Sequence, residues 1–98
     1  MPKEPISAIG SERLTVDATV GGVALTVPSA ARRAVITVET AEMRFTEDTT
    51  APTTTRGHLV NIGDVIKYMD NDWRGALLNW RGIRTTATSA VVEATYYV

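Results

Sequence analysis

Apolar and polar residues alternate along two stretches of this chain, with the period of two that is typical of a β-strand. In the stretch 34–40, Ala34, Ile36 and Val38 would share one face, and Val35, Thr37 and Glu39 the other. The stretch 90–98 repeats the pattern, and its residues on one side are Ala90, Val92, Ala94 and Tyr96. Both stretches therefore predict strands that bury one face.

Further short stretches are rich in β-prone residues and are bounded by turn residues. They are 13–16, 23–27, 42–46, 64–69 and 81–86. The pair Gly21-Gly22 tolerates positive φ, so it predicts a hairpin between the first two of these stretches. About seven or eight short strands with frequent turn signals predict an all-β fold, an antiparallel β-sandwich or barrel.

The alternation changes register between Val38 and Met43. If the even positions continued inward, Arg44 would enter the core, whereas Met43 and Phe45 form a suitable inward pair. A bulge or bend near Thr40-Ala41 would restore the register, and we predict one there.

The remaining segments lack a sustained strand pattern. Residues 1–12 contain Pro2, Pro5 and Gly10 and are predicted to form an extended arm, followed by a single β-domain over 13–98. The Thr- and Asp-rich stretch 46–57 is predicted to be a loop with nothing to bury and a candidate contact surface. The stretch 73–80 is interpreted as a loop with one helical turn.

Composition narrows the classes of partner. The 98 residues are 44% hydrophobic and 21% charged, which is typical of a globular domain. The formal charge of -1 lacks the basic excess of a nucleic-acid binder, so no nucleic-acid partner is expected. Without a signal-peptide pattern or an apolar run of about 18 residues, we expect a soluble protein made in the cytosol, with no membrane partner. The absence of cysteine rules out disulfides and thiolate metal ligands.

Candidate catalytic chemistry is sparse. His58 is the one histidine, and no serine lies in a setting that predicts a triad, so His58 is interpreted as a surface or strand-edge residue. Asp70-Asn71-Asp72 lacks the spacing of a calcium loop and is interpreted as a turn. We therefore expect no catalytic, cofactor-binding or metal-binding residues, and no enzyme activity.

Aromatic residues and arginines are interleaved in the C-terminal half, a combination that is enriched at protein interfaces. Both tryptophans could instead fill the ends of a small barrel, or stack on a ligand such as a sugar or single-stranded nucleic acid. The predicted interface also includes apolar residues of the arm, which could add a strand to a neighbouring sheet. Its members are Pro5, Ile6, Ile9, Tyr68, Trp73, Arg74, Trp80 and Arg81.

Several segments together resemble small β-rich structural proteins of tailed bacteriophages. They are 34–48 (AVITVETAEMRFTED), 50–58 (TAPTTTRGH), 61–66 (NIGDVI) and 94–98 (ATYYV). The resemblance covers roughly the last two thirds of the chain, which departs from the pattern at 68–80. It implies a virion structural protein, often a capsid decoration or cement protein that binds the outer shell, with the major capsid protein or another virion protein as partner. It also implies a homotrimer, made in the host cytoplasm and located in the virion.

Two alternatives remain open at this point. A tail, neck or fibre subunit of the virion would share the fold and differ in its partner. A carbohydrate-binding module would use Trp73 and Trp80 as stacking faces for sugar rings.

Overall fold

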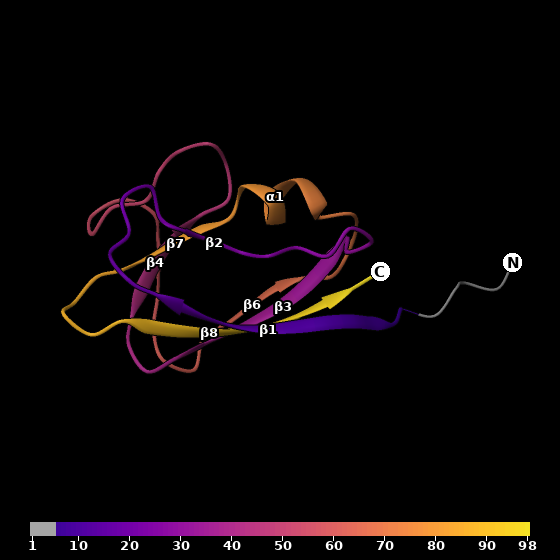
Figure 1. The fold of residues 1–98 in the computed structure, drawn as a ribbon, viewed down its shortest axis with the longest axis horizontal. Helices are drawn as coiled ribbons and strands as arrows, with labels where there is room; N and C mark the ends of the chain where they lie inside the picture. The colour runs from indigo at the N-terminus through magenta and orange to yellow at the C-terminus, as the bar shows by residue number, and fades with distance from the viewer. Residues whose placement is uncertain (1–5) are drawn as a thin grey trace, which may run out of the picture.

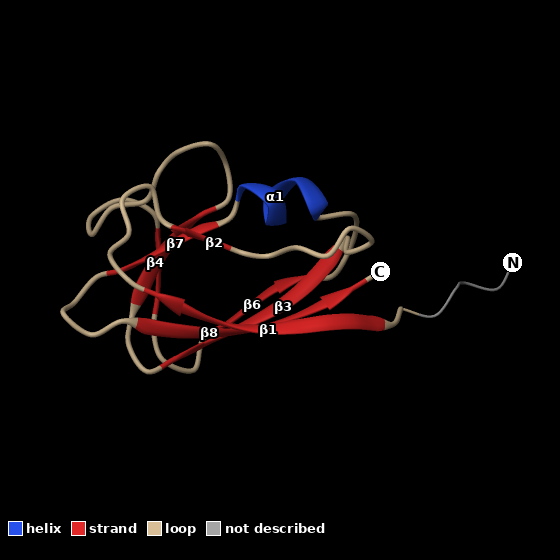
Figure 2. Cartoon of the chain, viewed as in Figure 1, coloured by secondary structure: helices blue, strands red, loops and turns tan. Residues whose placement is uncertain are grey.

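A computed structural model describes residues 6–98 of the chain. These residues form two four-stranded antiparallel sheets (Figure 2). The first sheet has the order β1-β8-β3-β6, with bounds Ala8–Val16, Ala90–Tyr97, Arg33–Glu39 and Val65–Tyr68. The second has the order β2-β7-β4-β5, with bounds Val23–Ala24, Arg81–Arg84, Met43–Thr46 and His58–Val60. The predicted all-β sandwich is confirmed.

The alternating stretches bury the faces that their patterns predict. Ala34, Ile36 and Val38 of β3 are buried, and the residues between them are half-buried. In β8, which lies between β1 and β3, the buried set consists of Ala90, Val92, Ala94 and Tyr96. These side chains form one core with Met43 and Phe45 of β4 in the opposite sheet.

The predicted bend at Thr40-Ala41 is confirmed, and it carries the chain from the first sheet to the second. Thr40 has φ +75°, a left-handed conformation, and the Ala41 N–H donates to the Glu39 carbonyl at 2.8 Å. Strand β3 belongs to one sheet and β4 to the other. A β-branched residue such as threonine is disfavoured at positive φ, because its Cβ crowds the backbone.

Thr40→Gly should therefore stabilise the fold by about 0.5–1 kcal/mol, since glycine adopts this φ without a Cβ contact. The measurement is the free energy of unfolding by urea titration. Thr40→Ala is the control, because alanine keeps a Cβ at the same φ and should give no gain. Equal gains in the two variants would contradict the explanation by backbone strain.

The predicted hairpin at Gly21-Gly22 is wrong. Strand β1 pairs with β8 and β2 pairs with β7, so the segments on either side of the glycines lie in different sheets. The glycines instead end a tight turn, in which the Gly22 N–H donates to the Thr19 carbonyl at 2.9 Å. Strand β2 is also shorter than the predicted stretch 23–27.

The first strand begins at Ala8, so residues 8–12 of the predicted arm belong to the first sheet, where they pair with β8. Glu12 is held in place, because its Oε1 accepts a hydrogen bond from the Thr26 N–H at 2.8 Å and another from the Tyr96 hydroxyl. Burial and this carboxylate raise the pKa of Tyr96 above its usual range. Residues 1–5 of the predicted arm lie outside the described residues.

The stretch 73–80 contains a six-residue helix, α1 (Arg74–Asn79), that lies over the first sheet beside the second (Figure 1). Leu77 is its buried residue and Trp80 immediately follows it. No helix within residues 6–98 is long and apolar enough to cross a membrane.

Candidate functional site

Two of the predicted interface residues belong to the core. The Trp80 side chain is 0% exposed and stacks on Phe45, with ring centroids 5.7 Å apart and an interplanar angle of 15°. Tyr68 is buried and donates its hydroxyl proton to the Glu47 carboxylate. The pKa of Tyr68 lies above its usual range, mainly because the hydroxyl is buried and also because it donates a hydrogen bond to the negatively charged Glu47 carboxylate. In this fold both side chains are therefore buried in the core instead of lying on the surface, and the Trp80 ring is not accessible for stacking on a sugar.

Three further members of the predicted interface hold segments of the chain together. Trp73 is half-buried and packs against Tyr68, with ring centroids 5.3 Å apart. The Arg74 Nη1 donates to the carbonyls of Pro28 and Ala31 at 2.7 and 2.9 Å. The Arg81 Nη1 donates to the Trp80 carbonyl at 2.9 Å. These side chains fasten α1 to the neighbouring loop and strand.

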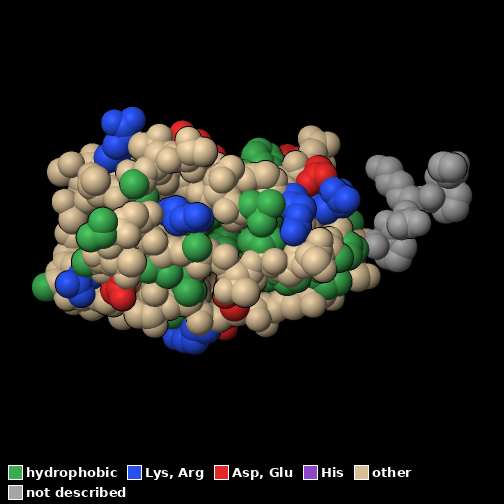
Figure 3. Space-filling model, turned by 45° about the horizontal axis from the view of Figure 1, so that its top comes forward, with side chains coloured by type: hydrophobic (Ala, Val, Ile, Leu, Met, Phe, Trp, Pro, Cys, Tyr) green, Lys and Arg blue, Asp and Glu red, His purple; other side chains and the backbone are tan. Residues whose placement is uncertain are grey.

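The apolar arm residues that the structure describes are exposed. Ile6 is 51% exposed and Ile9 is 38% exposed, at the beginning of the edge strand β1. Val98 is also exposed, and its N–H donates to the Ser7 carbonyl at 3.2 Å, so it lies at the same end of the sheet. We call Ile6, Ile9 and Val98 the terminal patch. Figure 3 shows hydrophobic side chains at this end of the body, beside the grey residues. Pro5 lies outside the described residues.

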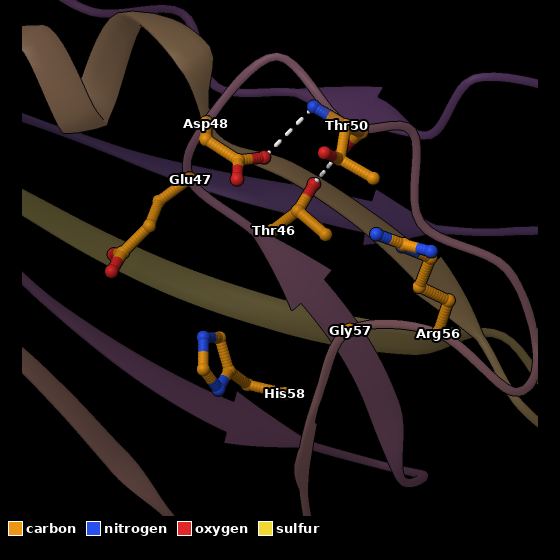
Figure 4. A pocket seen from close by; sticks show the side chains of 7 residues that line it. All are labelled: Thr46, Glu47, Asp48, Thr50, Arg56, Gly57 and His58. Atoms are coloured by element: carbon orange, nitrogen blue, oxygen red, sulfur yellow. Dashed lines mark hydrogen bonds between the residues drawn. The ribbon is translucent and has the colours of Figure 1, made fainter.

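The loop between β4 and β5, residues 47–57, borders a polar pocket of about 450 Å³ (Figure 4). The pocket is lined by Thr46, Glu47, Asp48, Thr50, Arg56, Gly57 and His58. His58 lies on the edge strand β5 and is exposed, with its ring 5.2 Å from the Phe45 ring, so the strand-edge interpretation is confirmed. The loop also buries Pro52, which corrects the prediction that it has nothing to bury.

The acidic groups of the polar pocket already have partners within the chain. Glu47 accepts from Tyr68, and the Asp48 Oδ1 accepts from the Thr50 N–H at 2.8 Å. The Thr50 N–H lowers the pKa of Asp48, because it stabilises the charged carboxylate. No group of three or more His, Asp or Glu side chains within residues 6–98 is placed to hold a metal ion. The pocket offers hydrogen-bonding groups and both signs of charge, without a serine or cysteine among its lining residues.

An apolar groove of about 420 Å³ lies on another side of the same loop, where the loop 17–22 approaches it. The groove is lined by Ala18, Val20, Gly21, Ala51, Pro52, Thr53, Thr54 and Ile83, none of which is charged. Figure 1 shows the indigo loop after β1 and the pink loop after β4 at the same end of the molecule, away from the N-terminal end.

The apolar groove was not predicted from the sequence. Its lining residues come from three separate segments, and only the fold brings them together. One signal was present: Val20 precedes Gly21-Gly22 at a turn, where polar residues are usual.

No family model matches this chain, and the searches of curated proteins and of solved structures found no match.

Proposed function

We propose that this chain is a non-enzymatic structural protein of a tailed-bacteriophage virion, a capsid decoration protein that binds the outer shell through its terminal patch. The support comes from the resemblance of four sequence segments to such proteins, together with a sandwich fold suited to a rigid structural subunit. The homotrimer that the resemblance implies stays a prediction.

The observation that carries the proposal is the exposure of Ile6, Ile9 and Val98 beside the outer edge of β1, which pairs with no strand between residues 6 and 98. Full burial of an isoleucine side chain stabilises a fold or a complex by about 1.5–3 kcal/mol relative to leaving it exposed. The exposed isoleucines therefore retain this free energy for a contact with another molecule. An apolar patch next to an unpaired strand edge can bind another protein by burying these side chains and by adding main-chain hydrogen bonds.

The test uses purified chain and undecorated shells of the phage that encodes it. We expect saturable binding and a higher melting temperature of the shells, because a protein that binds only the intact shell stabilises it. The double variant Ile6→Asp/Ile9→Asp should bind at least about tenfold more weakly, because charged side chains would enter an apolar contact.

Val65→Asp is the matched control, since Val65 is an exposed apolar residue on the other edge strand of the first sheet. It should leave shell binding unchanged. Failure of the original chain to bind shells would overturn the proposal, and so would binding that depends on Val65 and not on the terminal patch. Localisation of the chain to the tail or neck in an intact virion would support the alternative virion role.

A further inference from the structure

Val20 is an apolar side chain that the fold leaves almost completely exposed. It is 97% exposed, the largest exposed fraction among the large hydrophobic residues between residues 6 and 98. It lies at the tip of the turn from Thr19 to Gly22. Burial in a contact with another molecule would remove this apolar surface from water.

The turn that carries Val20 is held rigidly. The Thr19 N–H donates to the Asp17 Oδ1 at 2.9 Å, and the Thr19 hydroxyl donates to the same oxygen. These two hydrogen bonds lower the pKa of Asp17, so the acceptor is ionised at neutral pH. Gly22 packs so closely against Arg81 and Pro52 that a Cβ there would lie 2.8 and 2.9 Å from their side chains. A rigid turn loses little conformational entropy when its tip enters a partner.

The apolar groove lies directly beside Val20, which forms part of its rim together with Gly21. Pro52 and Ile83 are buried at its floor, and Ala51 is exposed at its edge. The groove has no charged lining residue, so it suits a small aliphatic side chain such as the one that projects next to it.

We propose that the apolar groove binds Val20 of a second copy of this chain, in a two-fold contact in which each copy inserts its Val20 into the groove of the other. A projection and a hollow that adjoin on one surface match themselves under a two-fold rotation. This inference goes beyond the proposed function, because the contact needs no shell protein.

The surface beside the groove carries one charge of each sign. A polar hollow of about 220 Å³ shares Gly21 and Ala51 with the groove and contains one acidic and one basic residue, Asp48 and Arg81. A two-fold rotation exchanges the positions of the two copies, so it can bring Asp48 of one copy toward Arg81 of the other. Opposite charges at the rim favour the correct orientation of the two copies.

The contact leaves the terminal patch free. The terminal patch adjoins the beginning of β1, whereas the loop 17–22 follows its end. Nine residues of extended strand separate the two regions by roughly 30 Å. The same copy can therefore contact a shell at one end and another copy at the other.

Self-association should be weak and should depend on Val20. Each copy contributes one inserted side chain and one small groove, which is a small contact beside the roughly 800 Å² that each partner buries in a standard stable interface, so we expect a dissociation constant of about 0.1 mM. Sedimentation equilibrium of the full chain, without shells, should show an average mass that rises with concentration. Val20→Asp should raise the dissociation constant by about a hundredfold, because two valines lose their buried environment.

Ile62→Asp is the matched control. Ile62 is 64% exposed and, like Val20, lies in a tight turn, but it does not line the groove. This variant should associate like the original chain. A circular dichroism melt of each variant shows whether its fold is retained, which is expected because both side chains are exposed.

A charge exchange tests the pairing of Val20 with the groove directly. Ala51→Arg places a long cation at the edge of the groove and should also abolish self-association. Mixed in equal amounts, Val20→Asp and Ala51→Arg should associate again. One contact of the mixed pair is then intact, and in the other an aspartate meets an arginine.

The proposal is overturned if the original chain stays monomeric up to about 1 mM, the upper end of weak association. It is also overturned if Val20→Asp associates as well as the original chain, or if the mixed variants do not associate. Each of these outcomes leaves the shell-binding role intact, because that role is measured with shells and the terminal-patch variant.

Discussion

Trp80→Ala should lower the free energy of unfolding by about 3–5 kcal/mol, the range for deletion of a large buried aromatic side chain. Trp80 is completely buried, stacks on Phe45 and packs against Gly82, where a Cβ would lie 2.9 Å from the indole ring. Its removal would leave a cavity in the core beside Phe45 and Gly82 that the surrounding strands cannot fill. Urea titration followed by circular dichroism measures the loss.

Two further variants keep this prediction testable if Trp80→Ala does not fold. Trp80→Phe retains an aromatic ring against Phe45 and should lose only about 1–2 kcal/mol. Trp73→Ala removes the tryptophan that is half-buried, and should cost less than Trp80→Ala. A larger loss at Trp73 than at Trp80 would contradict the assignment of Trp80 to the core.

Gly22→Ala should destabilise the fold by about 2–4 kcal/mol. Alanine would have to adopt φ +88° at a cost of about 1–2 kcal/mol, and its Cβ would overlap Arg81 and Pro52. Both contacts involve atoms near the backbone or in a ring, so they cannot move away freely. The overlap would separate the loop 17–22 from the loop 47–57.

Gly21→Ala is the matched control for this prediction, because Gly21 has φ +87° but nothing within 4 Å of the added Cβ. It should lower the free energy of unfolding by only about 1–2 kcal/mol, the cost of placing alanine at a positive φ. The difference between the two melting curves isolates the effect of close packing. Equal losses would show that only backbone conformation matters at both positions.

The alternation of apolar residues predicted the parts of the fold that depend on local pattern. The buried faces of β3 and β8 follow from period two, because a strand in a sandwich has one face in the core and one in water. The bend at Thr40 was predicted for the same reason, since only a change of direction lets Val38 and Met43 both point inward.

The pairing of strands could not be predicted in the same way. Gly21-Gly22 is a sound turn signal, but a turn does not determine whether the next strand joins the same sheet or the opposite one. Strand β5 is only three residues long and has an exposed, irregular pattern, so it was missed. Strand β5 forms by pairing with β4, on the other side of the loop 47–57, so its presence depends on a contact with another segment and not on its own sequence pattern.

The candidate site was predicted in part. The apolar character of Ile6 and Ile9 is visible in the sequence, and the structure leaves both exposed. The spacing of Trp73 and Trp80 is compatible with a core or a surface position, and burial depends on the strands that surround them. Arginines that bind main-chain carbonyls, such as Arg74, have no local signature that separates them from interface arginines.

The position of β8 between β1 and β3 has a consequence for biosynthesis. Ala8 pairs with Tyr97, so β1 finds its neighbour in the sheet only after residues 90–97 have emerged from the ribosome. Synthesis proceeds at about 5–20 residues per second, which leaves β1 and one edge of β3 without their shared partner strand for several seconds. Such distant pairing also slows folding itself, to the millisecond-to-second range. Newly made chains are thus most vulnerable to aggregation and to cellular proteases before translation of β8 is complete.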